Sequence, residues 1–425
     1  MPEPRAKPKR KLKSQPERWA RPKPQGAHQE KKVNPIVTIL LSVLVFGFLI
    51  FVHEFGHYIT ARIFKVTILE FSIGMGPRLI TWRSKKTGIQ YSIAAIPFGG
   101  FVSMAGEDGT YPEDNPENKG AEEIYGPSSG VPPMPEDTEA DGEPEYSGAL
   151  AKRSDPNGFD KKPAWQRFII TVAGAFVNIV VGFLVMIIFT VLPRTNLGGT
   201  EIHSLYEIEN LLDSVTSDDL ILPNDIITHI NGKRVSIANE LQYEITRQGY
   251  QPVDVTLIRG GKEITIPDVQ FPVSSESGQS FGNLNFYVKR VEKSFGTVIS
   301  HSFKQGMLMV RMCWESIFDL ITGRFGFEAV SGPVGISTTI GTAASIGIEP
   351  LLYLVALISI NLGFMNMLPI PALDGGRTLT TLVEMITRKR IPPKVERIIN
   401  GVGLAVLLTL SAVVLIKDVV WLIFK

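Results

Sequence analysis

The chain contains a long apolar run, 35–64, which carries the motif H-E-x-x-H at residues 53–57. A helix of that length can cross a bilayer, which takes about 20 residues. On a helix, His53 and His57 project from one face and can bind one metal ion, with Glu54 beside them as a candidate general base. Ionisable residues at membrane depth are costly and therefore indicate function. The sequence predicts a metal site; the alternative is a chance match in which these side chains cap the span at the membrane interface.

Three further apolar runs raise the number of expected membrane spans to four. They cover about 168–192, 351–368 and 402–424, the last being interrupted by Lys417 and Asp418. With their flanking residues, the expected spans are 35–66, 163–193, 349–376 and 398–425. The predicted fold class is therefore a polytopic α-helical membrane protein with four transmembrane helices.

The segments between the spans differ in composition. Residues 1–34 are basic and rich in proline, and we expect a disordered tail. Residues 106–162 are acidic and rich in proline, glycine and serine, which predicts a flexible insertion. Residues 67–105 include a strand-like stretch that turns at Gly99 and Gly100, which predicts a membrane-associated β-hairpin or loop.

The segment that follows the second span, 198–275, has the pattern of a small inserted α+β domain. Short β-like runs at 225–232 and 253–258 enclose a helical stretch, about 238–247. Residues 276–348 follow as an amphipathic helix and a connector. Because apolar and charged side chains alternate along that helix, we expect it to lie in the membrane interface rather than to span the bilayer.

Composition restricts the chemistry of the site. The net charge of +1 gives no reason to expect a nucleic-acid partner. The only cysteine, Cys313, excludes an internal disulfide and a cysteine-rich zinc site, so histidine and carboxylate would have to hold the metal. A candidate third ligand is Asp374, beside a glycine pair after the third run; an ordinary exposed turn explains it equally well. Asn178 is a lone polar residue in the second run that could bond across helices or orient a ligand.

These motifs, in their order and in the runs that carry them, resemble the site-2 protease family of intramembrane zinc metalloproteases. The resemblance is to the bacterial members with a PDZ domain, the regulator-of-sigma protease type. It rests on H-E-x-x-H in the first run and on N-x-x-P-x-P-x-L-D-G, which stands here as Asn366 through Gly375. Further similar segments are 96–102, the run around Asn178, and 331–336. The resemblance covers roughly residues 36–105 and 163–425.

The resemblance implies a metalloendopeptidase that binds one Zn²⁺ ion through His53, His57 and Asp374, with Glu54 as the catalytic base. Such enzymes perform regulated intramembrane proteolysis. The implied substrates are single-span membrane proteins in the lipid bilayer, either anti-sigma factors or remnant signal peptides.

The resemblance further implies that Asn366 and Pro371 position the substrate beside the metal. A helical substrate has to unwind before a peptide bond can be attacked. We expect the loop around Gly99 and Gly100 to bind the unwound chain by strand addition, although the same loop could simply brace the first span.

By the same resemblance, 198–275 is a PDZ-like domain. It departs from the family pattern, because residues 220–225 read L-I-L-P-N-D in place of a Gly-Leu followed by Pro-Gly-Asp, and no clear carboxylate-binding loop follows. A role as a size filter over the active site is therefore as consistent with the sequence as peptide binding.

Charge in the loops predicts the orientation of the protein in a cell membrane, inner or plasma. Basic side chains are frequent in 370–401 and before the second span, which places both loops in the cytoplasm. The active site then faces the cytoplasm and the PDZ-like domain lies outside. The basic tail, with Lys31 and Lys32, points the opposite way.

Two functions of other classes remain open from the sequence. One is a catalytically silent membrane scaffold that binds partners through its PDZ-like domain. The other is a metal transporter that uses the histidine pair as a transit site. An intact set of candidate catalytic residues favours the protease over the scaffold. A transporter would require more polar residues facing one another across the spans than this sequence offers.

Overall fold

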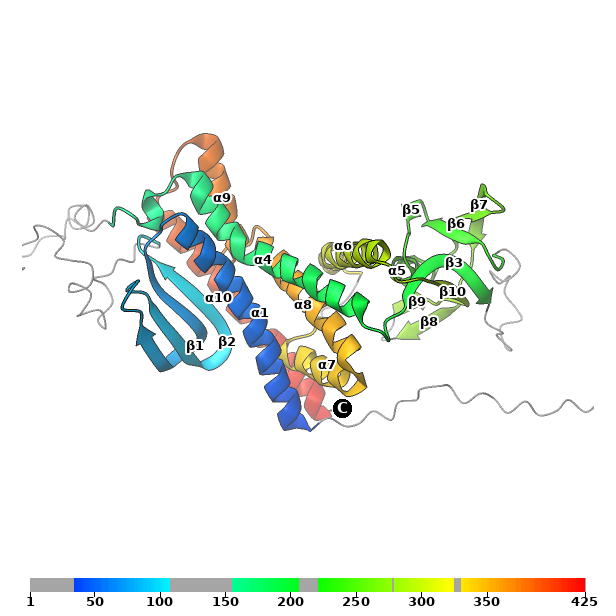
Figure 1. The fold of residues 1–425 in the computed structure, drawn as a ribbon, viewed down its shortest axis with the longest axis horizontal. Helices are drawn as coiled ribbons and strands as arrows, with labels where there is room; N and C mark the ends of the chain where they lie inside the picture. The colour runs from blue at the N-terminus through cyan, green and yellow to red at the C-terminus, as the bar shows by residue number, and fades with distance from the viewer. Residues whose placement is uncertain (1–33, 108–154, 206–220, 277–278, 325–329, 425) are drawn as a thin grey trace, which may run out of the picture.

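The computed structural model describes residues 34–107, 155–205, 221–276, 279–324 and 330–424 (Figure 1). The predicted basic tail, apart from its last residue, lies outside the described residues. So does most of the predicted acidic insertion, namely 108–154.

In the described part of the chain, four helices are long and apolar enough to cross a membrane. They are α1 (Pro35–Ile63), α4 (Ala164–Val191), α8 (Ile348–Met367) and α10 (Pro393–Phe424). Helix α4 packs on both α1 and α8 (Figure 1). Its contact with α8 is close at Gly363, where a Cβ atom would stand 2.6 Å from the Ala175 carbonyl oxygen. Small residues permit such backbone approach where no hydrophobic effect drives helices together.

The fourth apolar run makes a polar contact with a helix that lies outside the four runs. Helix α7 (Pro333–Ile346) begins beside α10, and the Asp418 carboxylate accepts a hydrogen bond of 3.0 Å from the Gly335 N–H. A carboxylate at a helix N-terminus satisfies an amide that has no partner inside the helix. The charge that interrupts the fourth apolar run is therefore bound by protein.

Strands β1 (Ile68–Arg83) and β2 (Gln90–Met104) form a sheet beside α1 (Figure 1). Both strands bend, so that 68–73 pairs with 90–93 on one side and with 100–104 on the other. Within the described residues, no further strand pairs with the outer edge of 100–104. This edge strand borders the candidate site.

The third membrane helix ends earlier than the predicted boundary at 376. Helix α8 stops at Met367, and Asp374 begins a separate helix, α9 (Asp374–Thr387). Pro369 and Pro371 explain the break, because proline lacks an N–H and disfavours helical backbone in the residue before it. Asp374 thus lies in the first turn of a new helix, not at the end of a span.

The predicted α+β domain forms around a mixed core of isoleucine, valine, leucine and phenylalanine. Its elements are β3 (Leu197–Leu205), β4 (Ile226–Ile230), β5 (Lys233–Arg234), α5 (Ala238–Gln248), β6 (Val253–Arg259), β7 (Lys262–Val269), β8 (Val273–Glu276), β9 (Gln279–Gly282) and β10 (Phe286–Val291). The main sheet has the order β10-β3-β4-β6-β7. Because β10 pairs with β3, the domain extends past the predicted boundary at 275.

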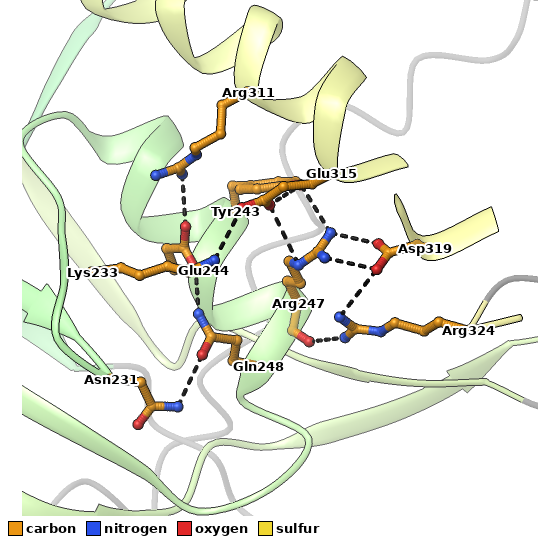
Figure 2. Close-up of polar contacts among 10 residues, drawn as sticks. All are labelled: Asn231, Lys233, Tyr243, Glu244, Arg247, Gln248, Arg311, Glu315, Asp319 and Arg324. Atoms are coloured by element: carbon orange, nitrogen blue, oxygen red, sulfur yellow. Dashed lines mark hydrogen bonds and ion pairs between the residues drawn. The ribbon is translucent and has the colours of Figure 1, made fainter. Parts of the chain in front are cut away.

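Helix α6 (Phe295–Ile321) joins this domain to the membrane helices. On one side the Ser302 hydroxyl donates to Thr190 of α4, at 2.9 Å. On the other side α6 meets α5 through a set of paired charges, which we call the α5–α6 ion-pair network (Figure 2). Its members are Lys233, Tyr243, Glu244, Arg247, Arg311, Glu315, Asp319 and Arg324. The amphipathic helix predicted within 276–348 is thus covered by protein along part of its polar face.

Candidate metal centre

Three potential ligand atoms converge near the end of α1. Nε2 of His53 lies 2.9 Å from Oδ2 of Asp374, and Nε2 of His57 lies 3.2 Å from the same oxygen. The two Nε2 atoms are 3.3 Å apart. Both histidines are buried and Asp374 is partly buried. The helical spacing of four residues supplies the histidine pair, and the break before α9 brings in the carboxylate.

Contacts to α4 orient the two imidazoles. Nδ1 of His57 lies 2.8 Å from the Ile170 carbonyl oxygen, to which it donates, so the lone pair is on Nε2. A Cβ atom at Gly174 would stand 2.2 Å from Nε2 of His57, so only glycine leaves room for the ring. Residues 170, 174 and 178 follow one another at intervals of four and share a face of α4.

Asn178 is the partner of the other histidine. Its side-chain nitrogen lies 3.3 Å from Nδ1 of His53, and its side-chain oxygen is buried without a hydrogen-bond partner in the described structure. The two ends of an amide side chain are assigned from their hydrogen bonds. When Nε2 of His53 binds a metal, Nδ1 carries the proton, so the amide has to present its oxygen to His53. The Ser359 hydroxyl donates to the backbone carbonyl oxygen of Asn178 at 2.7 Å and fixes this part of α4.

Glu54 faces a cavity of about 330 Å³ beside the histidines. The cavity is lined by Glu54, His57, Ile170, Thr171, Asp374, Arg377, Glu107 and the edge strand 100–104. The Glu54 carboxylate interacts with the backbone of Val102 in that strand. Gly100 lies so close that a Cβ atom would stand 3.0 Å from Cγ of Glu54. The Glu54 carboxylate, the His57 imidazole, Asp374 and an edge strand without an outer strand partner in the described residues therefore share one cavity.

The structure brings some predicted site residues together and leaves others apart. Glu54, His57, Asp374 and Gly100 line the cavity, His53 joins His57 and Asp374 in the ligand cluster behind it, and Asn178 contacts His53. Gly99, Asn366 and Pro371 are not among the residues that line it. Pro371 instead packs against Gly403 of α10, and Gly99 has a φ of +91° where β2 bends.

Sequence reasoning missed four contributors to the site. The Ile170 carbonyl is a backbone group, which no side-chain pattern reveals. Gly174 could have been found, because it stands four residues before Asn178 on the same helical face. Glu107 and Arg377 line the cavity from segments 270 residues apart, and nothing local in the sequence pairs them.

The donor set fits zinc. Zinc with histidine and carboxylate ligands at about 2.0–2.1 Å in a tetrahedron has ligand atoms about 3.3 Å apart. The observed separations of 2.9, 3.2 and 3.3 Å match that spacing. Three protein ligands leave the fourth position for water or substrate, as in catalytic zinc sites.

Known proteins agree with this chemistry. The family model of peptidase family M50 matches residues 41–410. A protein of Fusobacterium nucleatum that carries the name of a zinc metalloprotease is 28% identical over 92% of this chain and all of its own length. The regulator of sigma-W protease RasP of Bacillus subtilis is 27% identical, with 90% of this chain and 98% of RasP covered. The zinc metalloprotease RasP of Geobacillus kaustophilus is 28% identical, with coverages of 91% and 99%. The chain belongs to peptidase family M50, the site-2 protease family, and is a zinc metalloprotease.

Proposed function

We propose that the protein is an intramembrane metalloendopeptidase that cleaves single-span membrane proteins. His53, His57 and Asp374 hold the zinc ion, and Glu54 is the catalytic base. The observation that carries the proposal is that Glu54 lines one cavity with two members of the three-ligand cluster, His57 and Asp374, at the end of a membrane helix. The name of the RasP relative, a regulator of sigma-W protease, supports a substrate in transcriptional signalling, such as an anti-sigma factor.

Zinc, when bound, supplies a Lewis acid that polarises the peptide carbonyl and makes a water molecule more acidic. Glu54 then takes a proton from the attacking water and delivers it to the leaving amine. His57 keeps its lone pair on the metal side because Nδ1 donates to Ile170. Asn178 does the same for His53 from the opposite side of the ring. The protein's contribution is thus a fixed ligand geometry and a proton carrier beside it.

The substrate segment binds in extended form along the edge strand 100–104. That strand lines the cavity, and its outer edge has no strand partner in the described structure. Backbone pairing with this edge replaces the hydrogen bonds that an unwinding substrate helix loses. Gly99 provides the bend that turns the strand toward α1, and Gly100 lets it approach Glu54. Asn366 and Pro371 act on the substrate indirectly, by shaping the break before α9.

The active site opens toward the cytoplasm of a cell in which the four helices cross the inner or plasma membrane. Arg167, at the start of α4, pairs with Glu384 of α9 at 2.6 Å, so both basic loops lie on one side. The positive-inside rule assigns that side to the cytoplasm. The α+β domain then lies outside as the PDZ-like domain. The silent scaffold is the weaker alternative, because it gives no reason for Glu54 and all three ligands to stay together.

The test is hydrolysis of a tagged single-span substrate by the purified full-length protein in detergent, with Glu54→Gln and Glu263→Gln compared. Glu263 is an exposed carboxylate of the α+β domain and serves as the matched control. Loss of a general base lowers rates by about 10²–10⁴-fold, while the zinc content should be unchanged. Equal cleavage by the wild type and Glu54→Gln would rule out the proposed role of Glu54. Absence of cleavage by zinc-loaded wild type with a panel of such substrates would favour the scaffold.

A further inference from the structure

Two charged side chains outside the zinc ligands and Glu54 line the same cavity. Arg377 and Glu107 form an ion pair there, and their side chains are 26% and 17% exposed. Among the described residues that line the cavity, Arg377 is the only lysine or arginine. A guanidinium in a cavity built to receive a peptide can hydrogen-bond a carboxylate through two parallel N–H groups.

The pair stands at the end of the expected substrate path. Arg377 follows Asp374 by three residues on α9, so the two side chains lie on one face about 5–6 Å apart at Cβ. Glu107 follows the last residue of the edge strand, Met104, by three residues. An extended chain advances about 3.3 Å per residue. A peptide paired with the edge strand therefore reaches Arg377 about two residues from the carbonyl beside Asp374.

A purely structural role for the pair would be to tie β2 to α9. Other contacts already hold α9 in place. Arg167 pairs with Glu384 at 2.6 Å, and the Thr378 hydroxyl lies 3.2 Å from that of Thr171. An ion pair inside the cavity is thus not required to position the helix, and its placement favours a role toward what enters the cavity.

We propose that Arg377 is a specificity-determining residue that binds a carboxylate of the substrate about two residues from the cleaved bond. Glu107 occupies the guanidinium until the substrate carboxylate replaces it. The proposal rests on the proposed protease function and adds a preference for an anionic group at one substrate position. That carboxylate is either an Asp or Glu side chain within the chain or the free C-terminus of a trimmed chain.

Cleavage of matched substrates tests the preference. In a single-span substrate with a mapped cleavage site, one Asp is placed in turn at each of the three positions on either side of the cleaved bond. At one position Asp should raise kcat/KM about tenfold over Asn in the wild type, as expected for one charge-assisted pair. Arg377→Gln should abolish that difference, and Arg377→Glu should prefer Lys at the same position. Lys389→Gln, an exposed basic residue just beyond α9, is the matched control and should keep the preference.

Binding tests the proposal without turnover. Short extended peptides with Asp or Asn at each position are titrated into zinc-loaded Glu54→Gln, with and without Arg377→Gln. Asp should strengthen binding about tenfold only when Arg377 is present, and Glu107→Gln should strengthen it further by removing the competitor. Peptides that end at the preferred position are compared with a C-terminal carboxylate and with a C-terminal amide. This comparison distinguishes a side-chain carboxylate from a free C-terminus as the group that Arg377 binds. Melting temperature and zinc content verify that each variant is folded.

The outcomes separate the two proposals. If peptides bind with an Arg377-dependent preference for a carboxylate but no substrate is cleaved, the specificity site stands and the protease proposal fails. If substrates are cleaved but neither internal nor terminal carboxylates are preferred, or if the preference survives in Arg377→Gln, the inference about Arg377 is wrong.

Discussion

Two clusters of buried charge in the described part of the chain are balanced in different ways. In the α5–α6 ion-pair network, the carboxylates of Glu244, Glu315 and Asp319 each pair with lysine or arginine. In the candidate metal centre, Asp374 meets two histidines, which are neutral when they bind a metal. The first cluster is complete within the protein, whereas the second needs a cation. Buried carboxylates thus indicate a metal where imidazoles, not guanidinium groups, surround them.

The largest effect expected from this comparison is on zinc retention. Asp374→Asn keeps the shape of the side chain but removes the charge that balances the metal. We expect zinc to fall from one ion per chain to a small fraction of that, and proteolysis to fall about 10³-fold or more, as for loss of an essential group. Asp418→Asn is the control, because that carboxylate is also buried but contacts the start of α7. Full zinc content in Asp374→Asn would show that the carboxylate is not a ligand.

Removal of one partner should destabilise the α5–α6 ion-pair network and leave the zinc content of the protein unchanged. Arg247 binds Asp319 through two hydrogen bonds of 2.6 and 2.7 Å, and Asp319 is 2% exposed. Arg247→Ala leaves that buried carboxylate without its two hydrogen bonds and with only the more distant Arg324, 3.8 Å away, as an ion-pair partner in the described structure. Breaking a buried pair costs about 3–5 kcal/mol, and α5 should separate from α6. Hydrogen exchange of both helices measures the separation.

A double variant tests whether the cost comes from the orphaned charge. Replacing both partners, by Arg247→Met with Asp319→Leu, should recover most of the stability. Arg259→Ala, which breaks a pair inside the α+β domain, should leave the exchange of α6 unchanged. If the double variant is as unstable as Arg247→Ala, the interface depends on the ion pair itself.

The two clusters also differ in how far the sequence predicts them. His53, Glu54 and His57 are predictable because helical periodicity and apolar length are local signals. Asp374 lies 317 residues from His57; the local pattern left it equally well explained as an exposed turn, and the resemblance to a family motif favoured it as a ligand. The ion-pair network was not predicted at all. Charges on α6 look like the solvated face of an interfacial helix, since nothing local says that α5 covers them.

Chain breaks and domain edges show a similar limit. The average hydropathy of the third apolar run hides the break between Met367 and Asp374, although the two intervening prolines signal it. One of the two strand partners of β3 is β10, which follows it by more than 80 residues. The edge of the α+β domain therefore depends on a pairing that periodicity does not encode.

A smaller effect is expected from the residue that orients a ligand without binding the metal. Asn178→Leu removes the acceptor for Nδ1 of His53, and outer partners of this kind contribute about 10–100-fold to metal affinity or activity. Competition with a chelator should therefore remove zinc from the variant at a correspondingly lower chelator concentration. Thr190→Val is the matched control, because that hydroxyl is equally buried on α4 but bonds Ser302. Equal chelator resistance in Asn178→Leu and the wild type would assign Asn178 to helix packing only.

The smallest expected effect is that of low pH, which should open the ion-pair network and the metal centre by different mechanisms. Burial alone would raise the pKa of Glu315, but hydrogen bonds from Lys233 and Tyr243 and the charge of Arg247 hold that pKa below its ordinary value. A carboxyl whose pKa is lower in the folded state stabilises that state fully above its unfolded pKa, about 4.3, and loses this contribution as the pH falls through the folded pKa. The network should therefore remain closed at pH 5 and loosen below about pH 4.

Protection factors of α5 and α6, which correct for the intrinsic pH dependence of exchange, measure this opening. We expect a decrease of less than about tenfold, because partly exposed pairs contribute little, and Glu315→Gln should remove the pH dependence. Zinc release also follows acidification, since protons compete for imidazole, but its midpoint shifts with zinc concentration. The midpoint of the α5–α6 opening should not shift with zinc. If the pH midpoint of the α5–α6 opening shifted with zinc concentration, the metal centre and the ion-pair network would open as one cooperative unit. The distinction between a self-sufficient cluster and a metal-dependent one would then not hold.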